Sequence, residues 1–251
     1  MLSRAKTMFR KLHGRRSEPA PTPPAESEPT GPPPRAMHMD EVRKSPTPVY
    51  RRPFPNQTSI FVIVVNATGA PADLYRLLLR DTDSFEDDPT DDFTANYLCD
   101  GWVYDVSFMP APREAAKYNA FHSLAQHFCL VYTYKASSIE SWDETVAAVN
   151  AMRTRCRENN ISPFLATVIV ATGEEGEEPA VPDAEAEAFA AQHDARFIKV
   201  SPRSGSGMCA GVSWLVERAN GARDQYADNE EGREERYKRA EAFEALFPSE
   251  G

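Results

Sequence analysis

The chain has 251 residues, enough for one α/β domain with extensions, and its 41% apolar content is ordinary for a folded core. The net charge of -10 is uneven, because residues 1–56 carry +6 (11 basic, 5 acidic) and the rest carries -16 (17 basic, 33 acidic). An acidic remainder argues against a nucleic-acid groove, and four scattered cysteines without CxxC spacing argue against a disulfide framework or a zinc site.

Residues 1–56 are predicted to form a disordered, basic and Pro-rich tail, because they contain few large apolar side chains. The first twelve residues are basic and free of acids, and Ala5, Phe9 and Leu12 recur at helical spacing. This pattern leaves a mitochondrial transit peptide or an anionic-membrane patch open, beside a plain unstructured tail. We expect an intracellular, most simply cytoplasmic protein without prenylation, since Phe247–Gly251 contains no cysteine.

From residue 59 the pattern alternates between buried strands and amphipathic helices. Strands are predicted at 60–65, 102–106, 128–134, 165–170 and 197–200. Helices are predicted around 74–78, through 124, and at 139–157, 184–192 and 212–219, with an acidic loop at 81–92. This alternation predicts a doubly wound, mostly parallel sheet with helices on both faces. Ligands of such sheets bind at the carboxyl ends of the strands.

The order of these elements over about residues 59–220 resembles the Ras-like small GTPases. The strand Phe128–Tyr134, followed by Ser-Ser-Ile-Glu-Ser-Trp at 137–142, and the closing helix that ends Trp-Leu-Val-Glu-Arg at 214–218 carry the likeness. Asp88-Pro89-Thr90 is similar to the switch loop in which a threonine senses the terminal phosphate through magnesium. The resemblance implies a P-loop NTPase fold over residues 57–220. The dense charges that follow predict a charged, helical tail over residues 221–251.

The resemblance aligns the phosphate loop with residues 66–73, where the glycine-lysine-hydroxyl chemistry of G-x-x-x-x-G-K-[ST] is lost. Ala72 replaces the lysine, Asp73 replaces the hydroxyl, and Pro71 offers no N–H. A carboxylate about 4 Å from a phosphate repels it by roughly 4 kcal/mol at an effective dielectric near 20. Asp73 can instead stabilise the helix N-terminus or bind magnesium itself. The degenerate phosphate loop comprises Asn66, Thr68, Gly69, Ala72 and Asp73.

The water-positioning and base-selecting motifs are also altered. Phe108 aligns with the magnesium-linked aspartate, and Pro112 with the glutamine that orients water. Glu175 could mimic the guanine-binding aspartate, although an acidic loop at a strand end is more simply solvated. The degenerate base loops comprise Thr172, Gly173, Glu175, Ser201, Pro202 and Arg203.

Loss of four motifs predicts a catalytically inactive Ras-like domain that acts as a protein-interaction or signalling module, with no cofactor or metal. The expected partner surface comprises Asp88, Pro89, Thr90, Asp91, Asp92, Phe93, Phe108 and Arg113. The main alternative is an atypical signalling GTPase that binds GTP or GDP weakly with Mg²⁺. The glycines at 205, 207 and 211 leave a Rossmann-like enzyme as a third interpretation. The apolar end of the tail, Phe243 to Phe247, could dock on a partner or on its own domain.

Overall fold

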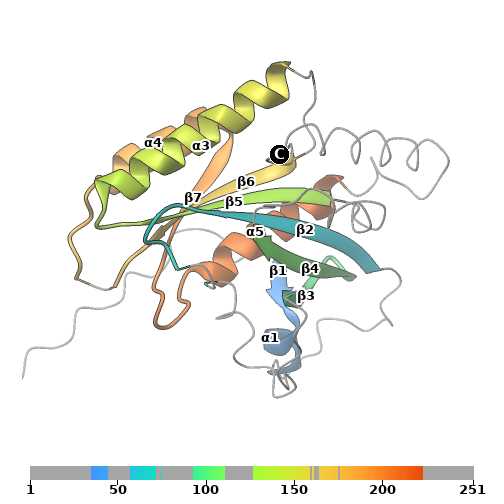
Figure 1. Ribbon diagram of the computed structural model, residues 1–251. Helices are drawn as coiled ribbons and strands as arrows, with labels where there is room; N and C mark the ends of the chain where they lie inside the picture. Colours follow the sequence, from blue (N-terminus) through green and yellow to red (C-terminus); the bar gives the residue numbers. More distant parts are fainter. Residues whose placement is uncertain are drawn as a thin grey trace, which may run out of the picture. The chain divides into compact units, whose positions relative to one another are not determined.

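A computed structural model describes residues 35–44, 57–71, 74, 93–110, 127–158, 160, 164–174 and 176–222. All of them lie in one compact unit, Pro34–Gly251. Within these residues the chain forms one seven-stranded sheet and four labelled helices (Figure 1). None of the helices among them is long and apolar enough to cross a membrane.

The sheet is mostly parallel and has the strand order β1-β3-β4-β2-β5-β6-β7. The strands are β1 (Ala36–His38), β2 (Gln57–Asn66), β3 (Phe93–Cys99), β4 (Trp102–Pro110), β5 (His127–Lys135), β6 (Phe164–Thr172) and β7 (Ala195–Val200). β3 pairs antiparallel with β1 and with β4, whereas every other pair is parallel. The predicted α/β class with a mostly parallel sheet is therefore confirmed.

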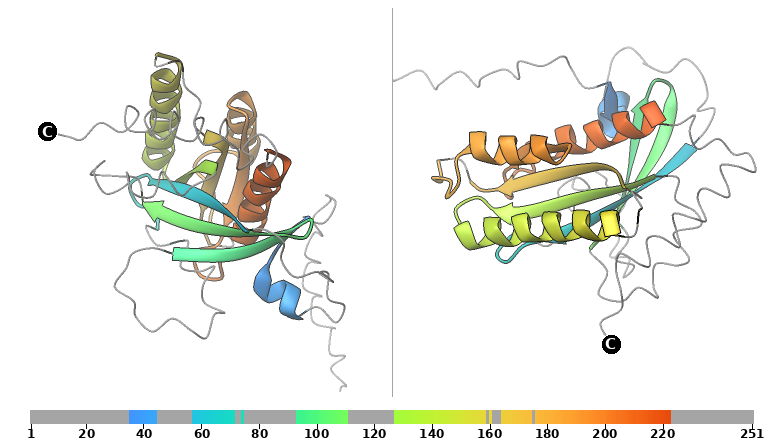
Figure 2. Two further views of the ribbon diagram at one scale, coloured as in Figure 1. Left: turned by 90° about the vertical axis from the view of Figure 1, so that its right-hand side faces the viewer. Right: turned by 90° about the horizontal axis from the view of Figure 1, so that it is seen from above.

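Helices cover both faces of the sheet, as Figures 1 and 2 show. They are α1 (Met39–Lys44), α3 (Ile139–Glu158), α4 (Asp183–Gln192) and α5 (Met208–Ala222). Alternate side chains of each central strand enter two separate cores: Cys129 and Val131 pack with α5, while Leu130 and Tyr132 pack with α3 and α4. Every residue of β5 except Lys135 is buried. This two-sided burial explains why the strand is a continuous apolar run.

The segment Arg35–Lys44 departs from the expected tail, because it forms β1 and α1. Ala36 is fully buried and Val42 is 2% exposed. Glu217 of α5 accepts hydrogen bonds from the backbone N–H groups of Arg35 and Ala36, at 2.5 and 3.2 Å. The edge of β3 offers unpaired backbone groups, and a short strand with a small buried residue satisfies them. Tertiary pairing thus orders a segment whose local composition favours disorder.

A tight hairpin joins β3 to β4. Asp100 and Gly101 both have positive φ, 50° and 83°, as expected of a two-residue type I′ turn with the sequence Asp-Gly. The predicted strand at 102–106 extends to Pro110, and β3 precedes it where no strand was expected. The helices predicted around 74–78 and through 124 lie outside the described residues, apart from Leu74.

Candidate functional site

The sheet has a topological switch point at the carboxyl end of β2. β2 lies between β4 and β5, so the chain moves to one side of β2 and then to the other. Ligands of doubly wound sheets bind in the crevice at such a point. The loop after β2, residues 67–71, lies here beside Lys135, the last residue of β5.

The loop after β2 is held to β5 by its own polar groups. The Thr133 hydroxyl donates to Asn66 Oδ1 at 2.5 Å, and the Ala67 N–H donates to the Thr133 carbonyl at 2.9 Å. The Ala70 N–H closes a turn on the Ala67 carbonyl at 3.1 Å, with Gly69 at φ 81°. Asn66 therefore anchors the loop, and its side-chain oxygen already accepts a hydrogen bond.

A carboxylate from α3 accepts a hydrogen bond from a backbone N–H group of this loop. The Thr68 N–H donates to Glu144 Oε2 at 2.7 Å. In a phosphate loop such N–H groups point at phosphate oxygens. Here an internal anion accepts the hydrogen bond, and a bound phosphate would have to displace it.

Lys135, at the end of β5, is a cation beside this loop. Its side-chain stem contacts the position that a Cβ on Gly69 would take, with Cδ at 3.7 Å. Hydrogen bonds from the Ser137 side chain and the Glu174 N–H lower the pKa of Glu177, and the charge of Lys135 lowers it further. Lys135 thus lies within electrostatic range of a carboxylate of the next loop.

The two loops predicted to contact a base lie next to each other. The Gly173 N–H donates to the Val200 carbonyl at 3.2 Å, and the Thr172 hydroxyl donates to the Tyr134 carbonyl at 2.8 Å. Arg203 Nε lies 4.0 Å from Glu174 Oε2. A cavity of about 250 Å³ lies between these loops, lined among others by Ala136, Gly173, Glu174, Glu177, Ser201 and Ser206. The structure thus brings Thr172, Gly173, Ser201 and Arg203 together at the carboxyl ends of β6 and β7.

The turn that carries Ser201, Pro202 and Arg203 is closed on itself. The Ser201 N–H donates to the Ser206 carbonyl at 3.2 Å, and the Gly205 N–H donates to the Ser201 carbonyl at 2.8 Å. Gly207 has φ 91°, and a Cβ there would lie 2.0 Å from the Lys199 carbonyl oxygen. Only glycine therefore fits at position 207, where the loop passes close to β7. Gly207 is one of the three glycines, at 205, 207 and 211, that left a Rossmann-like enzyme as an interpretation, and this close approach gives it a structural role.

The predicted partner surface is corrected at Phe108. Its side chain is 1% exposed and belongs to the core on the α5 face, because β4 continues its parallel pairing with β2 as far as Pro110. Phe108 therefore packs in the core and is not a surface contact. Of Phe93 only the backbone, at the start of β3, is described. The other predicted positions lie outside the described residues: Ala72, Asp73, Asp88, Pro89, Thr90, Asp91, Asp92, Arg113 and Glu175.

Three charged residues of this edge were not predicted from the sequence: Lys135, Glu144 and Glu177. Glu144 is 76 residues from the backbone group that it binds, and an exposed helical glutamate has no local signal for such a role. Lys135 ends a strand that is otherwise buried, and ligands of such sheets bind at the carboxyl ends of the strands, so its position is a signal in the sequence.

The described residues contain no group of three or more metal-ligating side chains. The cavity beside the loops after β6 and β7 offers the Glu174 and Glu177 carboxylates to a ligand donor, while the Thr68 N–H of the loop after β2 already donates to the Glu144 carboxylate. No known protein family has a sequence pattern that matches this chain, and no curated protein matches it.

Proposed function

We propose that this chain is a catalytically inactive Ras-like domain that works by binding a protein partner in an intracellular signalling pathway. The order of its strands supports this proposal, since the first parallel strand lies at the centre and an antiparallel hairpin lies on one side of it. The loops that the resemblance aligns with the phosphate and base loops follow β2, β6 and β7.

The observation that carries the proposal is the hydrogen bond from the Thr68 N–H to the Glu144 carboxylate, at 2.7 Å. A phosphate oxygen at this N–H would approach a carboxylate of the same charge. Two such charges about 4 Å apart repel by about 1 kcal/mol in bulk water and by roughly 4 kcal/mol at an effective dielectric near 20. The lost lysine at Ala72 and the added carboxylate at Asp73 act in the same direction.

Magnesium and triphosphate do not fit the residues that are present. Phe108 occupies the aligned position of a magnesium-linked aspartate and is buried in the core. We therefore assign no hydrolytic step to this site. Partner binding is expected at the loops before β3 and after β4, with Phe108 excluded from the contact.

One observation favours the second candidate, a signalling GTPase that binds GTP or GDP weakly. The cavity of about 250 Å³ lies between the base-equivalent loops, and Glu174 and Glu177 line it. Carboxylates can accept hydrogen bonds from the N–H groups of a guanine base. Binding through the base alone would be weaker than binding through base and phosphates together.

A thermal-shift titration with GTP, GDP and guanosine, each with and without Mg²⁺, separates these candidates. A ligand at 100 times its dissociation constant stabilises a fold by about 2.7 kcal/mol. We expect no shift at millimolar nucleotide and no guanine nucleotide in the purified protein. A magnesium-dependent rise with GTP or GDP would refute the inactive-domain proposal, and a rise with guanosine alone would indicate a base site.

Restoring the phosphate loop tests the role of Glu144 directly. We expect the triple variant Ala72→Lys, Asp73→Ser, Glu144→Gln to bind GDP more tightly than the double variant Ala72→Lys, Asp73→Ser. The control is Glu140→Gln in place of Glu144→Gln, because Glu140 lies on the same helix and is hydrogen-bonded to Ser138 at 2.9 Å. Equal GDP-induced shifts for the Glu144 and Glu140 combinations would show that Glu144 does not oppose phosphate.

A further inference from the structure

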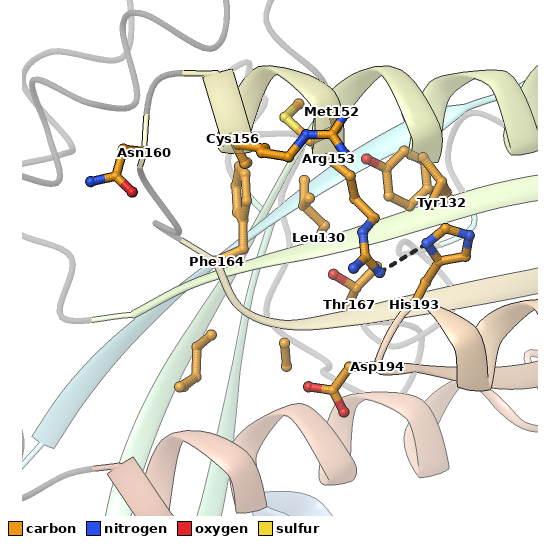
Figure 3. Close-up of a pocket in the computed structure, with 14 residues that line it drawn as sticks. Leu130, Tyr132, Met152, Arg153, Cys156, Asn160, Phe164, Thr167, His193 and Asp194 are labelled. Atoms are coloured by element: carbon orange, nitrogen blue, oxygen red, sulfur yellow. Dashed lines mark hydrogen bonds between the residues drawn. The ribbon is translucent and has the colours of Figure 1, made fainter.

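A second cavity lies at the other ends of the strands, under the C-terminal half of α3. Its volume is about 530 Å³, within the range of small-molecule sites. Figure 3 shows that α3, the start of β6 and the turn after α4 contribute its walls. It shares no lining residue with the cavity between the loops after β6 and β7.

The inner lining of this cavity is apolar. Leu130 of β5, Met152 of α3 and Ala166 of β6 are 3%, 7% and 6% exposed and all line the cavity. Phe164 adds an aromatic ring at the start of β6 (Figure 3). A ligand with an apolar body would bury surface against these side chains.

Tyr132, whose buried hydroxyl has no hydrogen-bond partner among the described residues, lines the same cavity. Tyr132 is 2% exposed, and within the described part of the chain its hydroxyl has no hydrogen-bond partner. Burial raises the pKa of this phenol far above its ordinary value, so the hydroxyl keeps its proton and remains a donor. Buried polar groups are normally satisfied, and an unsatisfied one in a cavity indicates an absent partner. A ligand oxygen can be that partner.

Two arginines of α3, Arg153 and Arg157, add positive charge to the lining. Arg153 donates to His193 Nδ1 at 2.9 Å, and this contact keeps that ring nitrogen an acceptor because a guanidinium cannot accept (Figure 3). Neither arginine forms an ion pair with a carboxylate that the structure describes. Asp194 also lines the cavity, but its carboxylate is 95% exposed and lies 3.8 Å from Arg218. The uncompensated charge of the lining is therefore positive, in a protein whose net charge is -10.

We propose that this cavity binds a small organic acid with an apolar body. The ligand carboxylate pairs with Arg153 and Arg157, the body lies on the Leu130, Met152 and Phe164 side chains, and the Tyr132 hydroxyl donates to a ligand oxygen. Arginine suits this role because its planar fork binds carboxylates with two hydrogen bonds. The proposal does not depend on whether nucleotide binds at the switch point.

Isothermal titration calorimetry with 4-phenylbutyrate tests the proposal on the full-length protein. We expect saturable one-to-one binding of the acid, and at least tenfold weaker binding of its uncharged counterpart 4-phenylbutanol. Absence of saturable binding at millimolar acid, or equal affinity for acid and alcohol, would overturn the proposal.

Substitutions of lining residues test whether the acid binds in this cavity. Arg153→Gln should weaken binding of the acid at least about tenfold, and Tyr132→Phe should weaken it several-fold. Arg155→Gln is the matched control for direct contact, because Arg155 lies on the same helix and does not line the cavity; its charge still acts on Tyr132, so a loss smaller than that in Arg153→Gln is expected there. Unchanged affinity in Arg153→Gln, or an equal loss in Arg155→Gln, would contradict the assignment.

Cys156 provides a readout that needs no change in the cavity. It lines the cavity and is half-buried, whereas Cys209 is exposed and would be replaced by serine. We expect 4-phenylbutyrate to slow alkylation of Cys156 by N-ethylmaleimide in proportion to its occupancy, and 4-phenylbutanol at the same concentration to have little effect. An alkylation rate that the acid leaves unchanged would overturn the proposal.

Discussion

Single polar groups at the two ends of the strands differ in whether a hydrogen-bond partner within the described residues already satisfies them. In the loop after β2, the backbone donor at Thr68 and the acceptor at Asn66 are both engaged within the chain. In the cavity under α3, by contrast, a buried phenol donor at Tyr132 has no partner among the described residues. A ligand must displace the internal partner of a polar group that is already hydrogen-bonded, whereas it can supply the missing partner of a group that is not. The two ends of the strands therefore differ in what they can bind.

Replacement of Tyr132 by Phe should stabilise the protein without ligand. A buried hydroxyl without a partner costs about 1–3 kcal/mol, and Phe fills the same space without that cost. We expect the free energy of unfolding to rise by about 1 kcal/mol in urea denaturation. Tyr104→Phe is the control, because the Tyr104 hydroxyl donates to Asn220 Oδ1 at 2.9 Å and its loss should destabilise. Destabilisation by both substitutions would mean that Tyr132 has a partner in solution.

His193 should make stability depend on pH. Burial, and then the nearby charge of Arg153, lower its pKa below the ordinary value of 6.5. The native state therefore binds fewer protons than the unfolded chain between the lowered pKa and 6.5, so stability falls as the pH drops through this window. Above that window His193 is neutral in both states. The facing charged groups are Arg153 on α3 and Asp194 on its own turn.

His193→Gln removes this titration but keeps an acceptor for Arg153. We expect the variant to gain stability relative to the parent protein as the pH falls from about 7.5 to about 5.5, since only the parent must protonate His193 against its surroundings. Urea denaturation at three pH values in this range measures the difference. A constant difference across the range would show that His193 has the same pKa in both states.

At the scale of elements, the central strands were predictable and the edge was not. The runs at 60–65, 128–134 and 165–170 are apolar because both faces of β2, β5 and β6 are buried, and each predicted strand is present. β3 and its hairpin were missed although Asp100-Gly101 is a strong turn signal, because Thr94 and Asn96 are exposed and break the continuous apolar run that marks the central strands. The acceptor of β1, Glu217, lies 181 residues from Ala36, so no local pattern could indicate the pairing.

The attachment of β1 should depend on Glu217. Its carboxylate accepts from two backbone N–H groups of the segment, and Arg35 also pairs with Asp100 in the hairpin turn. We expect Glu217→Ala to speed hydrogen exchange in Ala36–His38 and to lower the free energy of unfolding by about 1–2 kcal/mol. Exchange in β2 and β5 should not change.

Glu187→Ala, an exposed glutamate of α4, is the matched control for this loss of charge. It should alter neither stability nor exchange in β1. Equal protection of Ala36–His38 in the Glu217 variant and the parent protein would show that strand pairing with β3 alone holds the segment.

At the scale of the whole molecule, one sheet joins two large apolar cores, beside a smaller cluster formed by Met39, Val42, Leu98 and Val103. Ile60 of β2 points into the core on the α5 face, and Ile169 of β6 points into the core on the α3 and α4 face; both are fully buried. Backbone hydrogen bonds of β5 link both strands, so neither core can lose its strands without exposing the other. The described part of the domain should therefore unfold in one step.

Ile60→Val and Ile169→Val test this coupling, one on each face. Each should lower the free energy of unfolding by about 0.5–1.5 kcal/mol, and the double variant should lose the sum to within about 0.5 kcal/mol, since the two side chains lie in separate cores. Trp142 packs in one core and Trp214 against the other, so fluorescence of single-tryptophan variants follows each core separately. Both probes should report the same unfolding midpoint in every variant, because β2 and β6 are both hydrogen-bonded to β5 and a loss of stability in one core therefore lowers the stability of the whole sheet. A substitution that shifted only the probe on its own face would mean that the two cores unfold independently.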